Sequence, residues 1–304
     1  MRGKIIRGVG GFYYVHATDG AIYECRAKGI FRKEKIKPLV GDDAEITVLD
    51  ATARTGNVDL LLPRKNTLIR PAAANVDQAM IVFALTQPRP NLNLLDRFLI
   101  LMSRQEIPVI ICFNKADLSG EEQIKELSEI YRGCGCEVCF MSVARREGLE
   151  RVRSLLDAKT TVLAGPSGVG KSSLTNAFLP EKHMEVGEVS RKIDRGKHTT
   201  RHTELLVLSP VADGVASSDE SGSTYLLDTP GFSSLYLQGI AYEELKNYFY
   251  EFTPCEPYCR FQGCMHLKEP DCAVKEAVER GDIHRARYES YALLVRELRE
   301  NRKY

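Results

Sequence analysis

A glycine-rich segment in the middle of the chain has the residue types and spacing of a phosphate-binding loop. It matches the pattern G-x-x-x-x-G-K-[ST] in full. Glycines let the backbone curl so that several N–H groups point at phosphate oxygens, with the N-terminus of a helix behind them. In this pattern the lysine reaches the β- and γ-phosphates and the last hydroxyl ligates Mg²⁺. The loop consists of Gly165, Pro166, Ser167, Gly168, Val169, Gly170, Lys171 and Ser172.

The segments on either side of the loop support this interpretation. Residues 160–164 are an apolar run that predicts a short buried strand, and residues 172–179 begin a helical pattern. A strand, a loop and a helix in this order are the context that the motif requires. A glycine loop that matched the pattern by chance would not be expected to lie between a strand and a helix. We therefore expect a nucleotide site here.

Two further motifs follow in the places where nucleotide switches lie. An apolar strand ends in the tetrapeptide DTPG, where Asp228 would hold Mg²⁺, usually through water, and the Gly231 N–H would sense the γ-phosphate. Upstream, the segment GKHTTR must supply a threonine for Mg²⁺, with Thr200 as first choice and Thr199 as second. Each segment alone is equally compatible with an ordinary turn. Their order after a phosphate loop is what indicates a switch.

The residues that would read the base precede the phosphate loop. The apolar run 108–113 predicts a strand, and 136–141 predicts a second strand ending near the same site. The Asp117 carboxylate would accept hydrogen bonds from guanine N1–H and the exocyclic amine together, a donor pair that adenine lacks. An ATPase has no use for this pairing, so the sequence predicts binding of GTP and GDP. The base-reading residues are Asn114, Lys115, Ala116 and Asp117, with Ser142 and Val143 placed to touch the guanine carbonyl.

The order of these motifs is inverted relative to ordinary small GTPases. There the phosphate loop comes first and the base-reading tetrad near the end, whereas here the tetrad lies about fifty residues before the loop. The chain therefore predicts a circularly permuted P-loop GTPase domain of the α/β class. Its original termini are joined, and its new termini open elsewhere.

Soft metal ligands gather in the C-terminal part of the chain, at Cys255, Cys259, Cys264, His266 and Cys272. Four of them form a Cys₃His set, a usual complement for structural zinc, so one of the five donors is surplus. Scattered buried thiols are the alternative, but they explain a loop-rich stretch with several prolines less well. We expect one Zn²⁺ per chain in a closed site, which argues against metal catalysis there.

Two helices are predicted near and after these metal ligands, at 271–280 and 283–301. The longer helix has an apolar face and an opposite face with several arginines, which would suit contact with RNA phosphates. Interspersed glutamates make a solvated face an equally good interpretation. The arginines are Arg285, Arg287, Arg296 and Arg299.

The first sixty or so residues predict a small β-barrel. Five short β-rich runs, with a hairpin signal at Asp19-Gly20, suit an OB-fold, a fold that commonly binds oligonucleotides. The basic loop 28–37 and nearby aromatic residues would suit RNA. The alternative is that the aromatic residues form the core and the charges a solvated loop. The aromatic residues are Phe12, Tyr13, Tyr14 and Phe31.

Composition narrows the classes further. With 304 residues, of which 43% are hydrophobic, the chain suggests two or three domains with real cores. A net charge of +1 excludes a chain that is basic throughout. No apolar run approaches the roughly 18 residues of a membrane span, and the first residues lack the apolar stretch of a signal peptide. We therefore expect no membrane contact, and a reducing cytoplasm in which the nine cysteines form no structural disulfides.

Taken together, these features resemble the bacterial ribosome small-subunit-dependent GTPase A family over nearly the whole chain. The motifs above carry the resemblance, with LPRKNTLIRP at 62–71, NVDQ at 75–78, Ser173 after the phosphate loop and Phe232 after DTPG. It implies zinc on Cys259, Cys264, His266 and Cys272, with Cys255 as the extra thiol. The expected domains are an OB-fold RNA-binding barrel (1–66), a permuted GTPase domain (67–234) and a zinc-binding helical domain (235–304).

The resemblance also implies a function. It is that of a monomeric GTPase that binds the small ribosomal subunit and its rRNA late in assembly. Hydrolysis would be slow alone and faster on the subunit, releasing the GTPase and another assembly factor. Two alternatives stay open: an RNA-docking checkpoint for which GTP is mainly a structural ligand, and a metabolite-linked GTPase that uses zinc for partner contact.

One group needed for catalysis is missing from its usual place. Phe232 stands where Ras-like proteins carry a glutamine that orients the attacking water, and phenylalanine cannot do so. We therefore expect slow intrinsic hydrolysis, in which Lys171, Thr200 and Asp228 stabilise charge. His198 is one source of the missing group, unless its role is only to contact RNA. A group supplied by the ribosome is the other.

Overall fold

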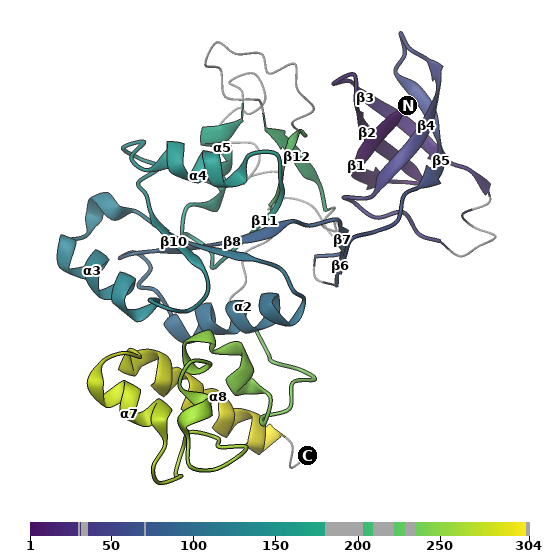
Figure 1. Cartoon of the computed structure of the whole chain (residues 1–304). Coiled ribbons are helices and arrows are strands. Elements are labelled where there is room, and N and C mark those ends of the chain that lie inside the picture. Colours follow the sequence, from purple (N-terminus) through teal and green to yellow (C-terminus); the bar gives the residue numbers. More distant parts are fainter. Residues whose placement is uncertain are drawn as a thin grey trace. The chain divides into compact units, whose positions relative to one another are not determined.

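The computed structural model describes residues 1–29, 31, 36–69, 71–179, 203–208, 222–228 and 235–301. They form a multi-domain α/β protein (Figure 1) with an N-terminal barrel, a six-stranded sheet with helices, and a C-terminal helical module. The predicted fold class is confirmed. None of the helices in the described ranges combines the length and apolar character that a bilayer span requires.

The N-terminal strands close into a barrel in the order β1-β2-β3-β5-β4. Inward-facing side chains such as Ile5, Val15, Cys25 and Val58 are fully buried, as the alternation of a closed sheet requires. The Asp19-Gly20 turn joins β2 to β3, with the Ala21 N–H donating to Asp19 Oδ1 at 3.0 Å. The strands are β1 (Arg2–Val9), β2 (Phe12–Ala17), β3 (Ile22–Ala27), β4 (Asp43–Asp50) and β5 (Thr55–Leu61).

Two of the four aromatic residues considered for RNA binding make contacts within the barrel. Phe31 is buried in the barrel core, so for this residue the alternative interpretation, an aromatic core, is the correct one. The Tyr14 hydroxyl donates to Glu24 at 2.8 Å, and the Arg7 guanidinium lies 4.0 Å from the Tyr14 ring centroid. Much of the basic loop lies outside the described residues.

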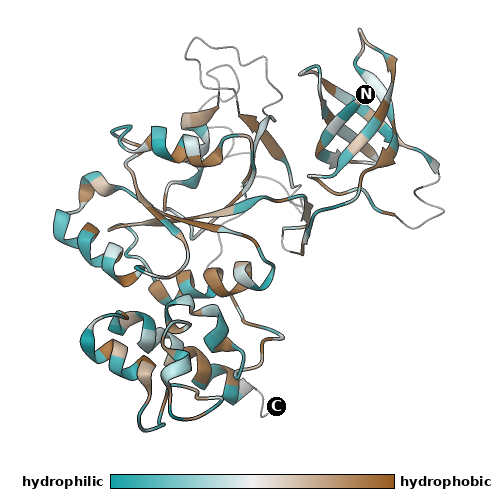
Figure 2. Cartoon of the chain, in the orientation of Figure 1, coloured by the Kyte–Doolittle hydropathy of each residue, from teal (hydrophilic) through white to brown (hydrophobic). Residues whose placement is uncertain are grey.

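The larger sheet has the strand order β10-β9-β8-β11-β13-β12. Strands β10, β9 and β8 pair in parallel, as do β11 and β13, while β12 is antiparallel to β13. Strands β8, β9 and β11 are buried along nearly their whole length and each contains a run of apolar residues, as expected for parallel strands covered on both faces (Figure 2). The strands are β8 (Gln78–Ala84), β9 (Val109–Asn114), β10 (Glu137–Phe140), β11 (Thr160–Ala164), β12 (Leu205–Leu208) and β13 (Thr224–Asp228), besides a two-stranded sheet of β6 (Thr67–Leu68) and β7 (Ala73–Ala74).

Within the described residues, four helices accompany this sheet. The first of them begins at an Asn91 cap, whose side chain accepts from the Leu94 N–H at 3.1 Å. Its buried Phe98 meets Phe83 of β8 edge to face, with ring centroids 6.5 Å apart. The helices are α2 (Leu92–Arg104), α3 (Glu121–Ile130), α4 (Leu149–Leu156) and α5 (Lys171–Phe178).

The C-terminal module packs around an aromatic core. Phe249, Phe252 and Tyr291 are fully buried, and their ring centroids lie 5.0–5.4 Å apart. The shorter predicted helix begins at Ala273 rather than 271, because Cys272 is its extended N-cap residue. The module contains three 3₁₀ turns, η2 (Leu245–Tyr248), η3 (Tyr250–Phe252) and η4 (Glu256–Tyr258), and two helices, α7 (Ala273–Arg280) and α8 (Arg285–Asn301).

One of the arginines assigned to an exposed face of α8 is a core residue. Arg287 is 2% exposed and donates to Asp96 of α2 and to Glu251 of η3, the latter at 2.6 Å. Its guanidinium also lies 4.6 Å from the Phe249 ring centroid. The assignment of Arg287 to an RNA-facing surface is therefore wrong. A helical wheel cannot show that two carboxylates from distant segments will surround it.

Two compact units make up the chain. The predicted three-part domain division stays a prediction, because these units group segments from different parts of it. The first consists of Met1–Gln78, Arg151–Leu163 and Lys171–Pro230, and the second of Ala79–Glu150, Ala164–Gly170 and Gly231–Tyr304.

Candidate functional site

The phosphate loop joins β11 to α5 and depends on its glycines. Gly165, Gly168 and Gly170 have φ angles of 142°, 79° and 97°, which side-chain-bearing residues rarely adopt. A Cβ atom on Gly165 would lie 2.1 Å from the carbonyl oxygen of Val82, and one on Gly170 would lie 2.3 Å from Asn114 Nδ2. Backbone and tetrad approach the loop too closely for any other residue.

The base-reading tetrad is braced directly against the phosphate loop. Asn114 Nδ2 donates to the carbonyl oxygen of Val169 at 2.9 Å, and its Oδ1 accepts from the Val143 N–H at 3.2 Å. Lys115 Nζ donates to the carbonyl oxygen of Gly168 at 2.9 Å and to that of Gln87. Segments about fifty residues apart in the sequence thus meet as predicted. The sequence did not predict the contact with Gln87, because Lys115 bonds only to its main-chain carbonyl oxygen.

Asp117 is oriented for a ligand with two neighbouring donors. The Ser142 hydroxyl donates to Asp117 Oδ1 at 2.5 Å and itself accepts from the Arg145 N–H at 3.1 Å. The Ala116 N–H donates to the carbonyl oxygen of Met141 at 3.0 Å, which fixes the tetrad to the end of β10. Among the described residues, Oδ2 of Asp117 has no hydrogen-bond partner, so it is available to a bound base.

The residues predicted to bind phosphate and Mg²⁺ lie at the start of α5 and at the end of β13. The Lys171 side chain is buried, and this burial lowers its pKa, while the charge of nearby Asp228 raises it. Ser172 and Ser173 are exposed at the start of α5, and Asp228 is exposed at the C-terminal end of β13. Hydroxyl and carboxylate oxygens are the ligands that Mg²⁺ prefers, so these residues fit that ion.

Several predicted switch residues cannot be placed. They lie outside the described residues, and their roles stay predictions: His198, Thr199, Thr200, Gly231 and Phe232.

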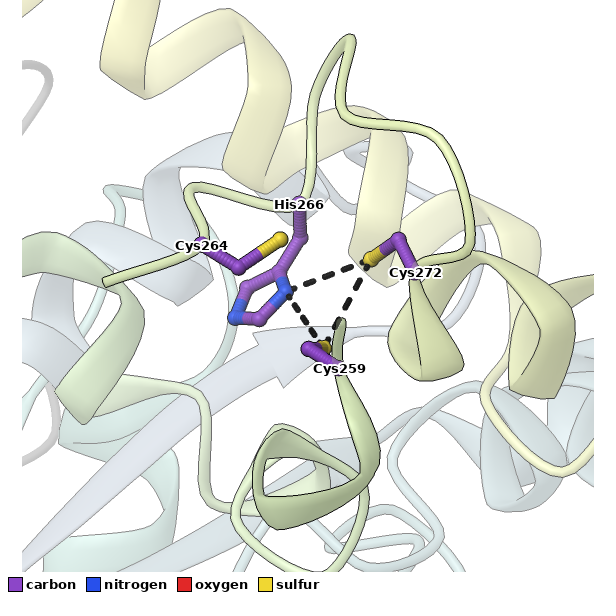
Figure 3. Close-up of side chains that lie close together, drawn as sticks. All are labelled: Cys259, Cys264, His266 and Cys272. Atoms are coloured by element: carbon purple, nitrogen blue, oxygen red, sulfur yellow. Dashed lines mark hydrogen bonds between the residues drawn. The ribbon is translucent and has the colours of Figure 1, made fainter. Parts of the chain in front are cut away.

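The predicted zinc ligands converge in the C-terminal module (Figure 3). The ligand atoms of Cys259, Cys264, His266 and Cys272 all lie within 4.8 Å of one another. His266 Nδ1 is 3.6 Å from Cys259 Sγ and 3.4 Å from Cys272 Sγ, and the two sulfurs are 3.9 Å apart. Zn–S bonds of about 2.3 Å and Zn–N bonds of about 2.0 Å in a tetrahedron require edges of roughly 3.5–3.8 Å. The three distances among Cys259, His266 and Cys272 are close to these edges, and Cys264 lies within 4.8 Å, so the set is compatible with one Zn²⁺; Cys255 lies outside it.

A carboxylate and an ammonium support this cluster from outside. Glu256 Oε1 lies 3.1 Å from His266 Nε2, which leaves Nδ1 to face the cysteines. Lys246 Nζ lies 2.8 Å from the same oxygen and donates to the carbonyl oxygen of Cys264 at 3.2 Å. Although burial raises it, the hydrogen bonds from Lys246 and His266 hold the pKa of Glu256 below its ordinary value. Nothing in the spacing of the sequence marked Glu256 or Lys246.

These features define a class of protein: a circularly permuted P-loop GTPase with a β-barrel before it and a Cys₃His module after it. Comparison with known families agrees. The family described as RsgA GTPase matches residues 61–238, and the one described as RsgA N-terminal domain matches residues 2–55. The chain belongs to the RsgA GTPase family and is a GTP phosphohydrolase. The resemblance inferred from the sequence is confirmed.

Relatives and solved structures are similar over the whole chain. The small ribosomal subunit biogenesis GTPase RsgA of Agathobacter rectalis is 51% identical over 314 residues and covers 100% of both chains. Its namesake from Alkaliphilus metalliredigens is 48% identical, covering 100% of this chain and 99% of its own. YjeQ from Thermotoga maritima is 35% identical with a TM-score of 0.78 and covers 98% of each chain. YloQ, described as a circularly permuted GTPase, is 39% identical with a TM-score of 0.75, covering 99% of this chain and 95% of its own.

Proposed function

We propose that this protein is a GTPase that binds the small ribosomal subunit and assists its late maturation. It hydrolyses GTP slowly alone and faster on the subunit, and hydrolysis releases it and another assembly factor. The relatives' names, which refer to small ribosomal subunit biogenesis, support the ribosomal part. Since ribosomes are assembled in the cytoplasm of bacteria, we propose that the protein acts there, as a monomer that contacts rRNA.

The observation that carries the nucleotide part is the bracing of the tetrad on the phosphate loop. Asn114 bonds to Val169 and Val143, and Lys115 bonds to Gly168, so the two halves of the site are fixed relative to each other before a ligand enters. Such preorganisation lowers the entropic cost of binding. We propose that guanine nucleotides bind through Asn114, Lys115, Ala116, Asp117, Ser142 and Val143 on the base side, and through Gly165 to Ser173 and Gly231 on the phosphate side.

Hydrolysis would rest on charge stabilisation by a few residues. The buried Lys171 ammonium places a cation beside the β- and γ-phosphates, where exclusion of water strengthens its effect. Ser172, Asp228 and Thr200 would hold Mg²⁺, which neutralises phosphate charge when bound. Phe232 cannot orient the attacking water, so His198 or a group from the ribosome is proposed for that role.

The zinc module would serve as structure rather than catalysis. Four protein ligands close a tetrahedral site and leave no position for water or substrate. We propose one Zn²⁺ on Cys259, Cys264, His266 and Cys272. Its role is to fix the loops between η4 and α7.

Nucleotide-dependent binding to purified small ribosomal subunits tests the ribosomal part. The protein should sediment with small subunits in the presence of a non-hydrolysable GTP analogue and separate from them with GDP, while large subunits retain it with neither. Equal sedimentation with both nucleotides would favour the checkpoint in which GTP is a structural ligand. Failure to bind small subunits under any condition would contradict the assignment.

A further inference from the structure

A hydrogen bond links the barrel to the strand that carries Asp228. His16 Nδ1 on β2 and the Tyr225 hydroxyl on β13 are 2.9 Å apart, and their rings meet edge to face with centroids 5.7 Å apart. Lys4 of β1 lies 5.7 Å from the centroid of the same tyrosine ring. All of these residues belong to one compact unit. The barrel thus contacts the second residue of a short strand, β13, whose last residue is Asp228.

A second contact lies on the neighbouring strand. Arg7 of β1 forms an isolated antiparallel bridge with Glu204, which directly precedes β12, and Arg7 Nη1 lies 3.6 Å from the Glu204 carboxylate. Barrel strands β1 and β2 therefore meet both β12 and β13. This contact is exposed enough for solvent to weaken the ion pair, so the buried Tyr225 contact is the stronger of the two.

Strand β13 is held firmly enough to act as one body. It pairs with β11 on one side and β12 on the other, and Tyr225, Leu226 and Leu227 are buried. At roughly 3.3 Å per residue, Tyr225 and Asp228 are about 10 Å apart along the strand. A displacement of the strand at Asp228 therefore reaches Tyr225 with little loss.

The tyrosine hydroxyl makes the barrel sensitive to such a displacement. Tyr225 is 7% exposed, so a shift that broke its bond to His16 would leave a buried hydroxyl without this partner. The positions of β13 and of the barrel are thus linked energetically. Since Asp228 also lies close enough to raise the pKa of Lys171, the linked strand borders the nucleotide site itself.

We propose that His16 and Tyr225 are positioning residues that couple the barrel to the metal-binding side of the GTP site through β13. A change in bound nucleotide shifts β13 and alters the His16–Tyr225 contact, and RNA on the barrel acts on Asp228 by the same route. Such coupling is reciprocal for binding free energies. The part that involves RNA rests on the proposed function, whereas the nucleotide-dependent contact does not.

Histidine-ring NMR of the full-length protein, bound to GDP or to a non-hydrolysable GTP analogue with Mg²⁺, tests the contact without ribosomes. The His16 ring resonances, assigned by their loss in His16→Asn, should differ between the two nucleotide states. The difference should disappear in Tyr225→Phe, which keeps the ring and removes only the hydroxyl. It should persist in Tyr23→Phe, where the lost hydroxyl bonds to Asp19 instead, at 2.7 Å. Identical His16 resonances in both states of the wild-type protein would overturn the proposal.

Turnover with small subunits then tests the RNA part. Tyr225→Phe should keep its KM for GTP and its unstimulated rate, but lose at least about fivefold of the stimulation, the low end of ordinary coupling between sites. His16→Asn, whose amide can replace Nδ1, should retain more stimulation than His16→Ala. If small subunits stimulate Tyr225→Phe as fully as the wild-type protein, the proposal that RNA on the barrel acts on Asp228 through Tyr225 is overturned. If small subunits do not stimulate the wild-type protein, the proposed function is contradicted instead. The NMR result then still decides whether the His16–Tyr225 contact depends on the bound nucleotide.

Discussion

In the proposed function, base selection at the residue scale depends on which oxygen of Asp117 faces the ligand. Ser142 holds Oδ1 at 2.5 Å, so a substitution at Oδ2 changes only the group turned toward the base. Asp117→Asn should replace an acceptor by a donor there. We expect its affinity for GTP to fall at least about a hundredfold, because guanine donors would meet a donor, while xanthosine triphosphate binds better than GTP. Competition against fluorescent nucleotide measures both, and an unchanged preference for GTP would contradict this assignment.

Gly170 is the residue at which loop and tetrad are closest. In Gly170→Ala the new Cβ would lie 2.3 Å from Asn114 Nδ2, at a φ of 97° that alanine rarely adopts. We expect an affinity for GDP at least about tenfold lower, since strain of about 1–3 kcal/mol must be relieved by moving the loop. Gly120→Ala is the matched control, because a Cβ there meets open space. Equal affinities for the two variants would show that the bracing does not matter.

The metal cluster is a property of several elements together. Cys264→Ser should reduce bound zinc from about one ion per chain to nearly none and unfold the segment between η4 and α7, because structural zinc supplies much of the folding free energy of such segments. Cys255→Ser should keep its zinc, since Cys255 lies outside the cluster. Elemental analysis and circular dichroism give the two readouts. Loss of zinc in Cys255→Ser would show that the ligand set is wrong.

A buried ion triad joins α2, η3 and α8. Arg287→Met should cost about 3–5 kcal/mol of unfolding free energy, because it leaves Asp96 and Glu251 buried without their cation. Arg285→Met, at an exposed position, should change it by less than about 0.5 kcal/mol. Urea unfolding measures both, and similar values would refute this account of the triad.

The same triad predicts the sign of a pH effect. Burial raises the pKa of Asp96, while the charge of Arg287 opposes this. When the pKa of a carboxyl group is higher in the folded than in the unfolded state, the folded state binds the proton more tightly. The group's contribution to folding stability is therefore present at low pH and is lost as pH rises through the folded-state pKa. Without the cation the pKa rises further. Arg287→Met should therefore be less destabilised at about pH 5 than at about pH 7.5, and the opposite trend would exclude this explanation.

Most elements could be predicted from the sequence, because their patterns are local. The strand predicted at 160–164 is observed with the same bounds, and the helix that follows the phosphate loop is observed within one residue. The sequence left two interpretations open for Phe31, and it placed Arg287 on an exposed helix face although Arg287 is buried. Alternation and helical spacing show which side chains share a face, but not which distant residues cover that face. Phe31 and Arg287 are both explained only by contacts across the fold.

At the scale of the whole molecule, the motifs predicted to bind nucleotide are divided between the two compact units. The tetrad, Ser142 and the loop up to Gly170 lie in one compact unit, while Lys171 and Asp228 lie in the other. The chain passes from one unit to the other between Gly170 and Lys171. The unit that holds the tetrad also contains the C-terminal module, and the unit that holds Lys171 and Asp228 also contains the barrel. The coupling that we propose between the barrel and Asp228 therefore lies within a single unit.

The central claim, a GTPase triggered by the small ribosomal subunit, is tested most directly by steady-state turnover. GTP hydrolysis by the purified protein should be slow alone and rise steeply with small subunits, with no rise for large subunits and no hydrolysis of ATP. Turnover of GTP that is the same with and without small subunits would contradict the claim, even if the nucleotide site binds GTP as described.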